Sequence, residues 1–93
     1  MPSTVTLHAD QEVETRRQRL TLLGYALQQH GHPARLVRQR HDRWILRVHG
    51  HTVFCGGADG VYAYITRRGV ILAPADGDHV ASAVHRLLDG HLR

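Results

Sequence analysis

Residues 44–73, WILRVHGHTVFCGGADGVYAYITRRGVILA, decide the fold of this chain. Apolar and polar side chains alternate along most of the stretch, which is the pattern of strands with one buried face. Glycine-containing pairs and a glycine-rich segment interrupt the alternation at short intervals, as turns between strands do. The stretch therefore predicts consecutive antiparallel strands joined by short connections.

The first hairpin is predicted at Gly50-His51, because a Gly-X pair suits a two-residue turn. This turn sets Val48 opposite Val53, so that one side of the hairpin is aliphatic. The aliphatic set is Trp44, Leu46, Val48, Val53 and Cys55, and the opposite set is Ile45, Arg47, His49, Thr52 and Phe54.

The segment 56–60, GGADG, is predicted to be a five-residue loop before a strand over 61–67. A second turn at Arg68-Gly69 leads into a strand over 70–73. Size and apolarity assign Val61, Ala63, Ile65 and Leu72 to the core, and Tyr62, Tyr64, Thr66 and Ile71 to the other face. An earlier strand, residues 34–40, has two possible registers, because residues 41–43 fit a loop of two or three residues and a one-residue slip exchanges the faces.

Helices are predicted on both sides of the strands. Asp10 fits the N-cap of the first helix, and Gly31 and Pro33 end it. Its core stripe comprises Val13, Leu20, Leu23, Gly24 and Leu27, with Gly24 allowing a strand to approach closely. Asp76 or Asp78 caps a last helix that runs to about Asp89, ends at Gly90 and carries the stripe Val80, Ala81, Val84, Leu87 and Leu88.

The element order predicts one α+β domain over residues 1–93: helix, antiparallel meander of four or five strands, helix. Both helices pack on the aliphatic sheet face, which makes two layers and leaves the other face open. Residues 1–8 are expected to be a tail or a short edge strand. With 93 residues the core is small, so association with another chain would add stability.

The predicted open face is the main functional clue. A wholly solvated face would carry mostly threonine, serine, lysine and glutamate, whereas this one gathers aromatic and arginine side chains. Its candidate partner-binding residues are Arg47, His49, Phe54, Tyr62, Tyr64 and Ile71. Leu22 and Tyr25 form a second apolar patch on the first helix, away from its core stripe.

Two kinds of partner fit this face. The chain carries 12 arginines and no lysine, 8 acids and a net charge of +4, which favours acidic partners weakly. We expect a non-enzymatic, homodimeric adaptor or chaperone-like regulator that holds a protein partner on the open face or on an unpaired strand edge. The alternative is a regulator that stacks single-stranded nucleic acid on the tyrosines, with arginines on the phosphates. The acidic start of the last helix, ADGDH over 75–79, opposes phosphate and favours the protein partner.

No pattern in the chain predicts catalysis, a metal site or a cofactor. Cys55 alternates with Val53 as a packing residue does, whereas a nucleophilic cysteine would need a histidine base and a lowered pKa. The triplets His30-Gly31-His32 and His49-Gly50-His51 match no established metal-ligand spacing. The single cysteine and the lack of a long apolar run lead us to expect a cytoplasmic protein that does not contact membranes.

Overall fold

A computed structural model of the protein describes the backbone of residues 4–90 and the side chains of residues 11–89. Two helices flank one antiparallel five-stranded sheet in the order β1-β2-β3-β4-β5, with a short 3-10 turn at Arg40–Asp42. The elements are α1 (Thr4–Gln29), β1 (Ala34–Arg38), β2 (Trp44–Val48), β3 (His51–Ala58), β4 (Val61–Thr66), β5 (Ile71–Pro74) and α2 (Val80–Gly90). The α+β meander with a helix at each end is confirmed.

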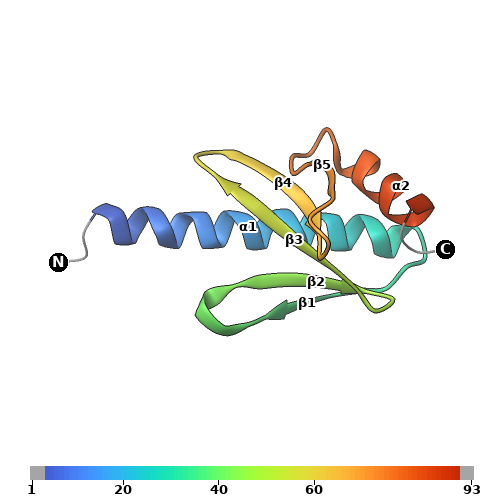
Figure 1. Cartoon of the computed structure of the whole chain (residues 1–93), viewed down its shortest axis with the longest axis horizontal. Coiled ribbons are helices and arrows are strands. Elements are labelled where there is room, and N and C mark those ends of the chain that lie inside the picture. Colours follow the sequence, from blue (N-terminus) through green and yellow to red (C-terminus); the bar gives the residue numbers. More distant parts are fainter. Residues whose placement is uncertain (1–3, 91–93) are drawn as a thin grey trace.

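The core lies between the sheet and the two helices. The long helix α1 runs behind the strands in Figure 1 and packs on β1, β2 and β3, while α2 packs on β5 and on α1. The main buried side chains are Leu20, Leu23, Leu27, Leu46, Val48, Val53, Cys55, Tyr62, Tyr64, Leu72, Ala73, Val84 and Leu87. Both helices therefore cover one sheet face, as predicted, and no helix of the described part of the chain lies on the opposite face.

Helix α1 is longer than the sequence pattern indicated. It begins at Thr4, so the expected tail or edge strand over residues 1–8 is wrong for residues 4–8, and residues 1–3 lie outside the described residues. Asp10 is inside the helix and is not its N-cap. No glycine or proline interrupts residues 4–23, so nothing stops the helix from extending toward its N-terminus. At its other end, Gly24 lies against Leu46 of β2, where a Cβ would come within 3.0 Å of a leucine methyl.

The turn between β2 and β3 is His49-Gly50 rather than Gly50-His51. Both residues have positive φ, 49° and 80°, as a type I′ turn requires. Val48 pairs with His51 and Leu46 with Val53, a shift of two residues from the predicted register. Because side chains alternate with a period of two, this shift leaves the predicted faces of β2 and β3 unchanged.

The connection between β3 and β4 is much shorter than the predicted five-residue loop over 56–60. Strand β3 continues to Ala58, and Asp59-Gly60 alone forms the turn, with φ values of 55° and 81°. Asp-Gly is a preferred type I′ pair, and it places Tyr64 opposite Cys55. The faces of β4 are therefore the reverse of those predicted. Tyr62, Tyr64 and Thr66 face the helices, whereas Val61, Ala63 and Ile65 face away.

Tyr64 is the largest fully buried side chain among the described residues. Its hydroxyl donates a hydrogen bond of 2.6 Å to the backbone carbonyl of Arg19, so the ring fills the core and its polar end is satisfied by α1. This contact explains why a tyrosine suits the core here. Burial raises the pKa of the Tyr64 phenol well above its usual value.

The structure also gives the register of β1 and the start of α2, which the sequence left with alternatives. Arg35 and Val37 face the open side, and Arg38 lies opposite Trp44 on the helix side. The guanidinium of Arg38 stands 5.9 Å from the centre of the indole ring. Before α2, Asp76 Oδ1 accepts a hydrogen bond of 2.9 Å from the backbone N–H of His79, so Asp76 caps the turn that leads into the helix at Val80.

Candidate partner-binding site

The sheet divides between β2 and β3. Their ladder begins at Val48 and His51 and ends at the pair of Leu46 with Val53. Beyond that pair, β2 continues with β1 as far as Trp44, while β3 continues with β4 as far as Ala58. The β1–β2 hairpin and the β3–β4 hairpin thus point in different directions in Figure 1. We call the space between them the slot.

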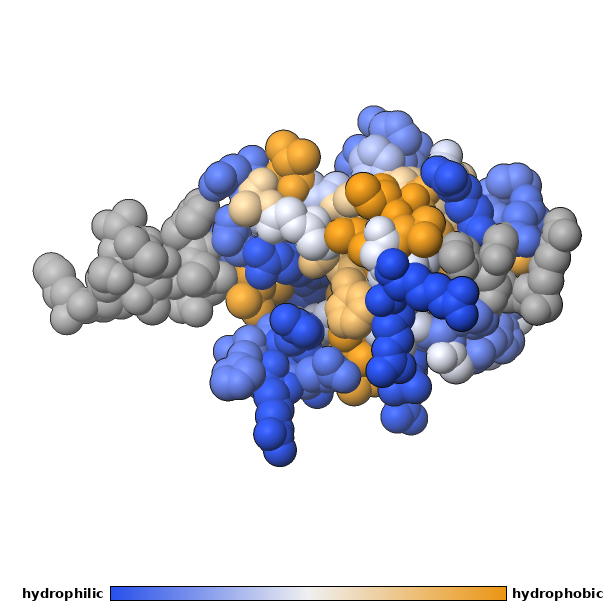
Figure 2. Space-filling view, viewed as in Figure 1, coloured by the Kyte–Doolittle hydropathy of each residue, from blue (hydrophilic) through white to orange (hydrophobic). Residues whose placement is uncertain are grey.

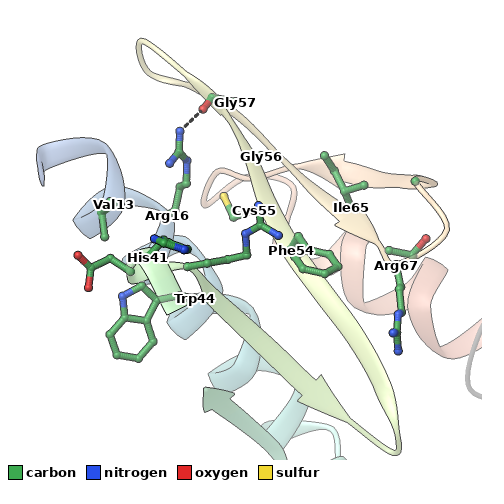
Figure 3. A pocket seen from close by; sticks show the side chains of 14 residues that line it. Val13, Arg16, His41, Trp44, Phe54, Cys55, Gly56, Gly57, Ile65 and Arg67 are labelled. Atoms are coloured by element: carbon green, nitrogen blue, oxygen red, sulfur yellow. Dashed lines mark hydrogen bonds between the residues drawn. The ribbon is translucent and has the colours of Figure 1, made fainter. Parts of the chain in front are cut away.

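The slot is a cavity of about 590 Å³, within the usual range of ligand-sized clefts. In Figure 3, Val13, Arg16 and Trp44 lie on one side of it, and Phe54, Ile65 and Arg67 lie on the other. The lining residues are Val13, Arg16, His41, Asp42, Arg43, Trp44, Phe54, Cys55, Gly56, Gly57, Ile65, Thr66, Arg67 and Gly69. The lining therefore combines aromatic rings and aliphatic side chains with several arginine side chains.

The slot carries an excess of positive charge. Asp42 is its only lining carboxylate among the described residues, and it is ion-paired with Arg38. Arg16 is engaged on both sides, because it lies 3.7 Å from Glu12 and donates a hydrogen bond of 2.9 Å to the carbonyl of Gly57. The guanidinium groups of Arg43 and Arg67 have no hydrogen bond or ion pair with any described residue. Two guanidinium groups are thus available to a ligand.

The connection between β1 and β2, which lines part of the slot, has a strained backbone. His41 and Asp42 are consecutive residues with left-handed φ values of 61° and 55°. Histidine and aspartate tolerate this region better than most residues, yet two in succession still cost free energy. This conformation brings the Asp42 carboxylate to Arg38 and leaves Arg43 in the wall of the slot.

The rest of the open face adjoins the slot. Ile45 is 1% exposed although it lies outside the main core, so this face has a small apolar cluster of its own. Phe54 and Ile65 pair across β3 and β4 on the same face. In the space-filling view, hydrophobic atoms gather over the sheet and hydrophilic side chains border them (Figure 2). Arg35 and Arg47 lie directly opposite each other on this face, a like-charge pair that an anionic partner would relieve.

The sequence-predicted site residues divide into four groups. Arg47, Phe54 and Ile71 lie on the open face as expected, with Ile71 59% exposed. Tyr62 and Tyr64 are buried against the helices, so their expected place on the open face is wrong.

His49 belongs to the turn, where its Nε2 lies 3.0 Å from Nδ1 of His32. Leu22 and Tyr25 are exposed on α1 and share no lining with the slot.

Sequence reasoning missed Arg43, Ile65 and Arg67. The sequence pattern places Arg43 in a loop, and it assigns Ile65 to the core because it exchanges the two faces of β4. The Asp59-Gly60 pair carried the missing signal, because a two-residue turn there fixes the register of β4 and turns Ile65 toward Phe54. The divergence of β2 from β3 has no evident signature in the sequence.

The described residues do not form a reactive or metal-binding cluster. Burial raises the pKa of the Cys55 thiol to about 11, which keeps it protonated and poorly nucleophilic at neutral pH. No three histidine, cysteine, aspartate or glutamate side chains converge within residues 11–89 as a metal site would need. Over the described part of the chain, no helix has the length and apolarity to span a bilayer.

Comparison of the chain with protein-family models, with curated proteins and with solved structures found no match. The geometry of the slot and of the open face is therefore the basis for any functional assignment.

Proposed function

We propose that the protein is a non-enzymatic binding module, an adaptor or chaperone-like regulator, that holds a segment of a protein partner in the slot. One observation carries this proposal: the sheet opens between β2 and β3 into an apolar-lined cavity in which the guanidinium groups of Arg43 and Arg67 have no partner among the described residues. Clefts with an apolar lining and a few convergent polar groups are the usual sites of ligand capture.

A protein partner fits this surface better than single-stranded nucleic acid does. The tyrosines that would have stacked bases are in the core, and Phe54 is the sole tyrosine or phenylalanine among the described residues of the open face. Arg38 is ion-paired with Asp42 on the helix side, which removes one phosphate contact. The arginines that remain are spread around an apolar surface, as they are at protein interfaces.

Selection of peptides by surface display tests this proposal. A random peptide library is panned on the immobilised protein and on the double variant Arg43→Glu/Arg67→Glu. The expected result is a set of peptides enriched on the parent protein and not on the double variant. Arg68→Glu, a single charge reversal outside the slot lining, should retain the same peptides. Equal enrichment on all three proteins, or none, would contradict the proposal.

Self-association through a different surface is part of the same proposal. Leu22 and Tyr25 are 40% and 62% exposed, and Tyr25 borders a groove between α1 and the edge strand β1. A second copy packed there would cover these side chains and leave the slot accessible. Tyr25→Glu should convert a dimer into a folded monomer in sedimentation experiments. A parent protein that is monomeric at all concentrations would rule out this part of the proposal.

A further inference from the structure

Among residues 4–90, no strand pairs with the edge of β3 that faces the slot. Along an antiparallel strand, the backbone groups of successive residues point to alternate neighbours. Because Ala58 and Val61 flank the two-residue turn, Ala58, Gly56 and Phe54 direct their N–H and C=O groups toward β4. Cys55 and Gly57 direct theirs toward the slot, where the ladder with β2 has already ended.

Side chains of α1 occupy the far end of this edge. Arg16 Nη2 donates to the carbonyl of Gly57, and Glu12 Oε1 accepts a hydrogen bond of 3.2 Å from the backbone N–H of Asp59. A donor and an acceptor from the helix thus stand where the backbone of a neighbouring strand would be. The N–H and C=O of Cys55 and the N–H of Gly57 have no strand beside them among the described residues.

We propose that the slot binds an extended acidic segment of the partner, which adds to β3 as a short strand along Cys55–Gly57. This inference rests on the proposed function and specifies the conformation and charge of the segment. Addition of a strand to an unpaired edge derives affinity from main-chain hydrogen bonds and specificity from pockets for alternate side chains.

The lining of the slot supports both features. An extended segment presents side chains to opposite sides in turn, so one set would meet Phe54, Ile65 and Arg67 and the other would meet Val13 and Trp44. Arg43 also lines the slot. Carboxylates match the planar guanidinium groups, which bind them in bidentate fashion. An extended segment that carries both acidic and apolar side chains therefore fits the slot better than a basic segment.

The test uses a synthetic probe, acetyl-Glu-Val-Glu-Val-Glu-Val-amide, and two analogues N-methylated at every glutamate or at every valine. N-methylation removes donors from one edge of the peptide and leaves its side chains intact. We expect the probe to bind with an affinity that falls at least about tenfold in one or both analogues, as the loss of several backbone hydrogen bonds implies. Amide exchange at Cys55 and Gly57 should slow on binding.

Variants and competitors separate the outcomes. Arg67→Glu should abolish binding of the probe, and Arg68→Glu should not. Binding that requires Arg67 but ignores N-methylation would overturn strand addition and leave the proposed function intact. The probe could also fail to bind while display selects non-acidic peptides that depend on Arg43 and Arg67. That result would overturn the acidic extended segment and leave the proposed function intact. A single-stranded oligonucleotide that binds more tightly than any peptide would overturn both proposals.

Discussion

The two faces of β4 differ in what surrounds their side chains. Tyr62 and Tyr64 face the helices and are 7% and 0% exposed, whereas Ala63 and Ile65 face the open side and are only partly covered. The more polar residues are thus in the core, and the aliphatic ones lie on the open face. The comparison shows that the register set by a turn, together with a hydrogen-bond partner for the phenol, outweighs apolarity in choosing the buried face.

The largest expected effect contrasts two neighbouring residues on these faces. Tyr64→Ala should lower the free energy of unfolding by about 3–5 kcal/mol, because it empties the space of a buried ring. Ile65→Ala should cost about 1 kcal/mol, since its side chain is partly exposed. Urea denaturation followed by circular dichroism measures both.

Tyr64→Phe is the control for the hydroxyl group. It should cost about 1 kcal/mol, the usual value of a hydrogen bond such as that to the Arg19 carbonyl. If Ile65→Ala were as destabilising as Tyr64→Ala, the orientation of β4 described above would be wrong.

The next effect tests the β3–β4 turn that fixes this orientation. At Gly57, with φ of 122°, a Cβ would lie 2.1 Å from the carbonyl oxygen of Val61. Gly57→Ala should therefore cost about 3 kcal/mol or abolish folding. Gly60→Ala is the matched control, because nothing lies within 4 Å of its added Cβ and only the positive φ opposes it. Its cost should be about 1 kcal/mol, and equal costs in thermal melts would disprove the close approach at Gly57.

Alkaline pH should destabilise the helix-covered face selectively. The pKa of Cys55 rises from 9.0 to about 11 on folding because the thiol is buried, so the unfolded chain loses its proton first. The associated stability is complete below pH 9 and is lost as pH rises toward 11, up to about 2 kcal/mol. The raised pKa of Tyr64 adds to the loss at higher pH, where its unfolded form ionises.

Cys55→Ala separates the two groups. Between pH 9 and 10 the variant should melt at nearly constant temperature while the parent protein loses stability, because the cysteine dominates this window. Parallel losses in both proteins would show that the thiol is not buried.

The smallest effect concerns the turn at the closed end of the β2–β3 ladder. His49→Asn should change stability by no more than about 0.5 kcal/mol, since asparagine suits the left-handed φ of 49° and compensates for the lost contact with His32. His49→Val should cost about 1–2 kcal/mol, because a β-branched residue is strained there. Equal melting temperatures for the two variants would contradict the type I′ turn.

The sequence predicted the elements better than it predicted their junctions. Alternation and helical stripes identified the strands and the core of both helices, because these patterns follow from period and burial alone. Asp59-Gly60 could have corrected β4, since a two-residue Asp-Gly turn pairs Cys55 with Tyr64. The slot could not have been predicted, because the divergence of two strands depends on the twist of the whole sheet and on the packing of α1.

Amide hydrogen exchange along β3 tests the central claim, that the sheet is open between β2 and β3, most directly. The account predicts alternation in the free protein: slow exchange at Phe54, Gly56 and Ala58, which pair with β4, and exchange at least about tenfold faster at Cys55 and Gly57, which face the slot. Uniformly slow exchange from Val53 to Ala58 would mean that β2 and β3 remain paired and that the slot does not exist.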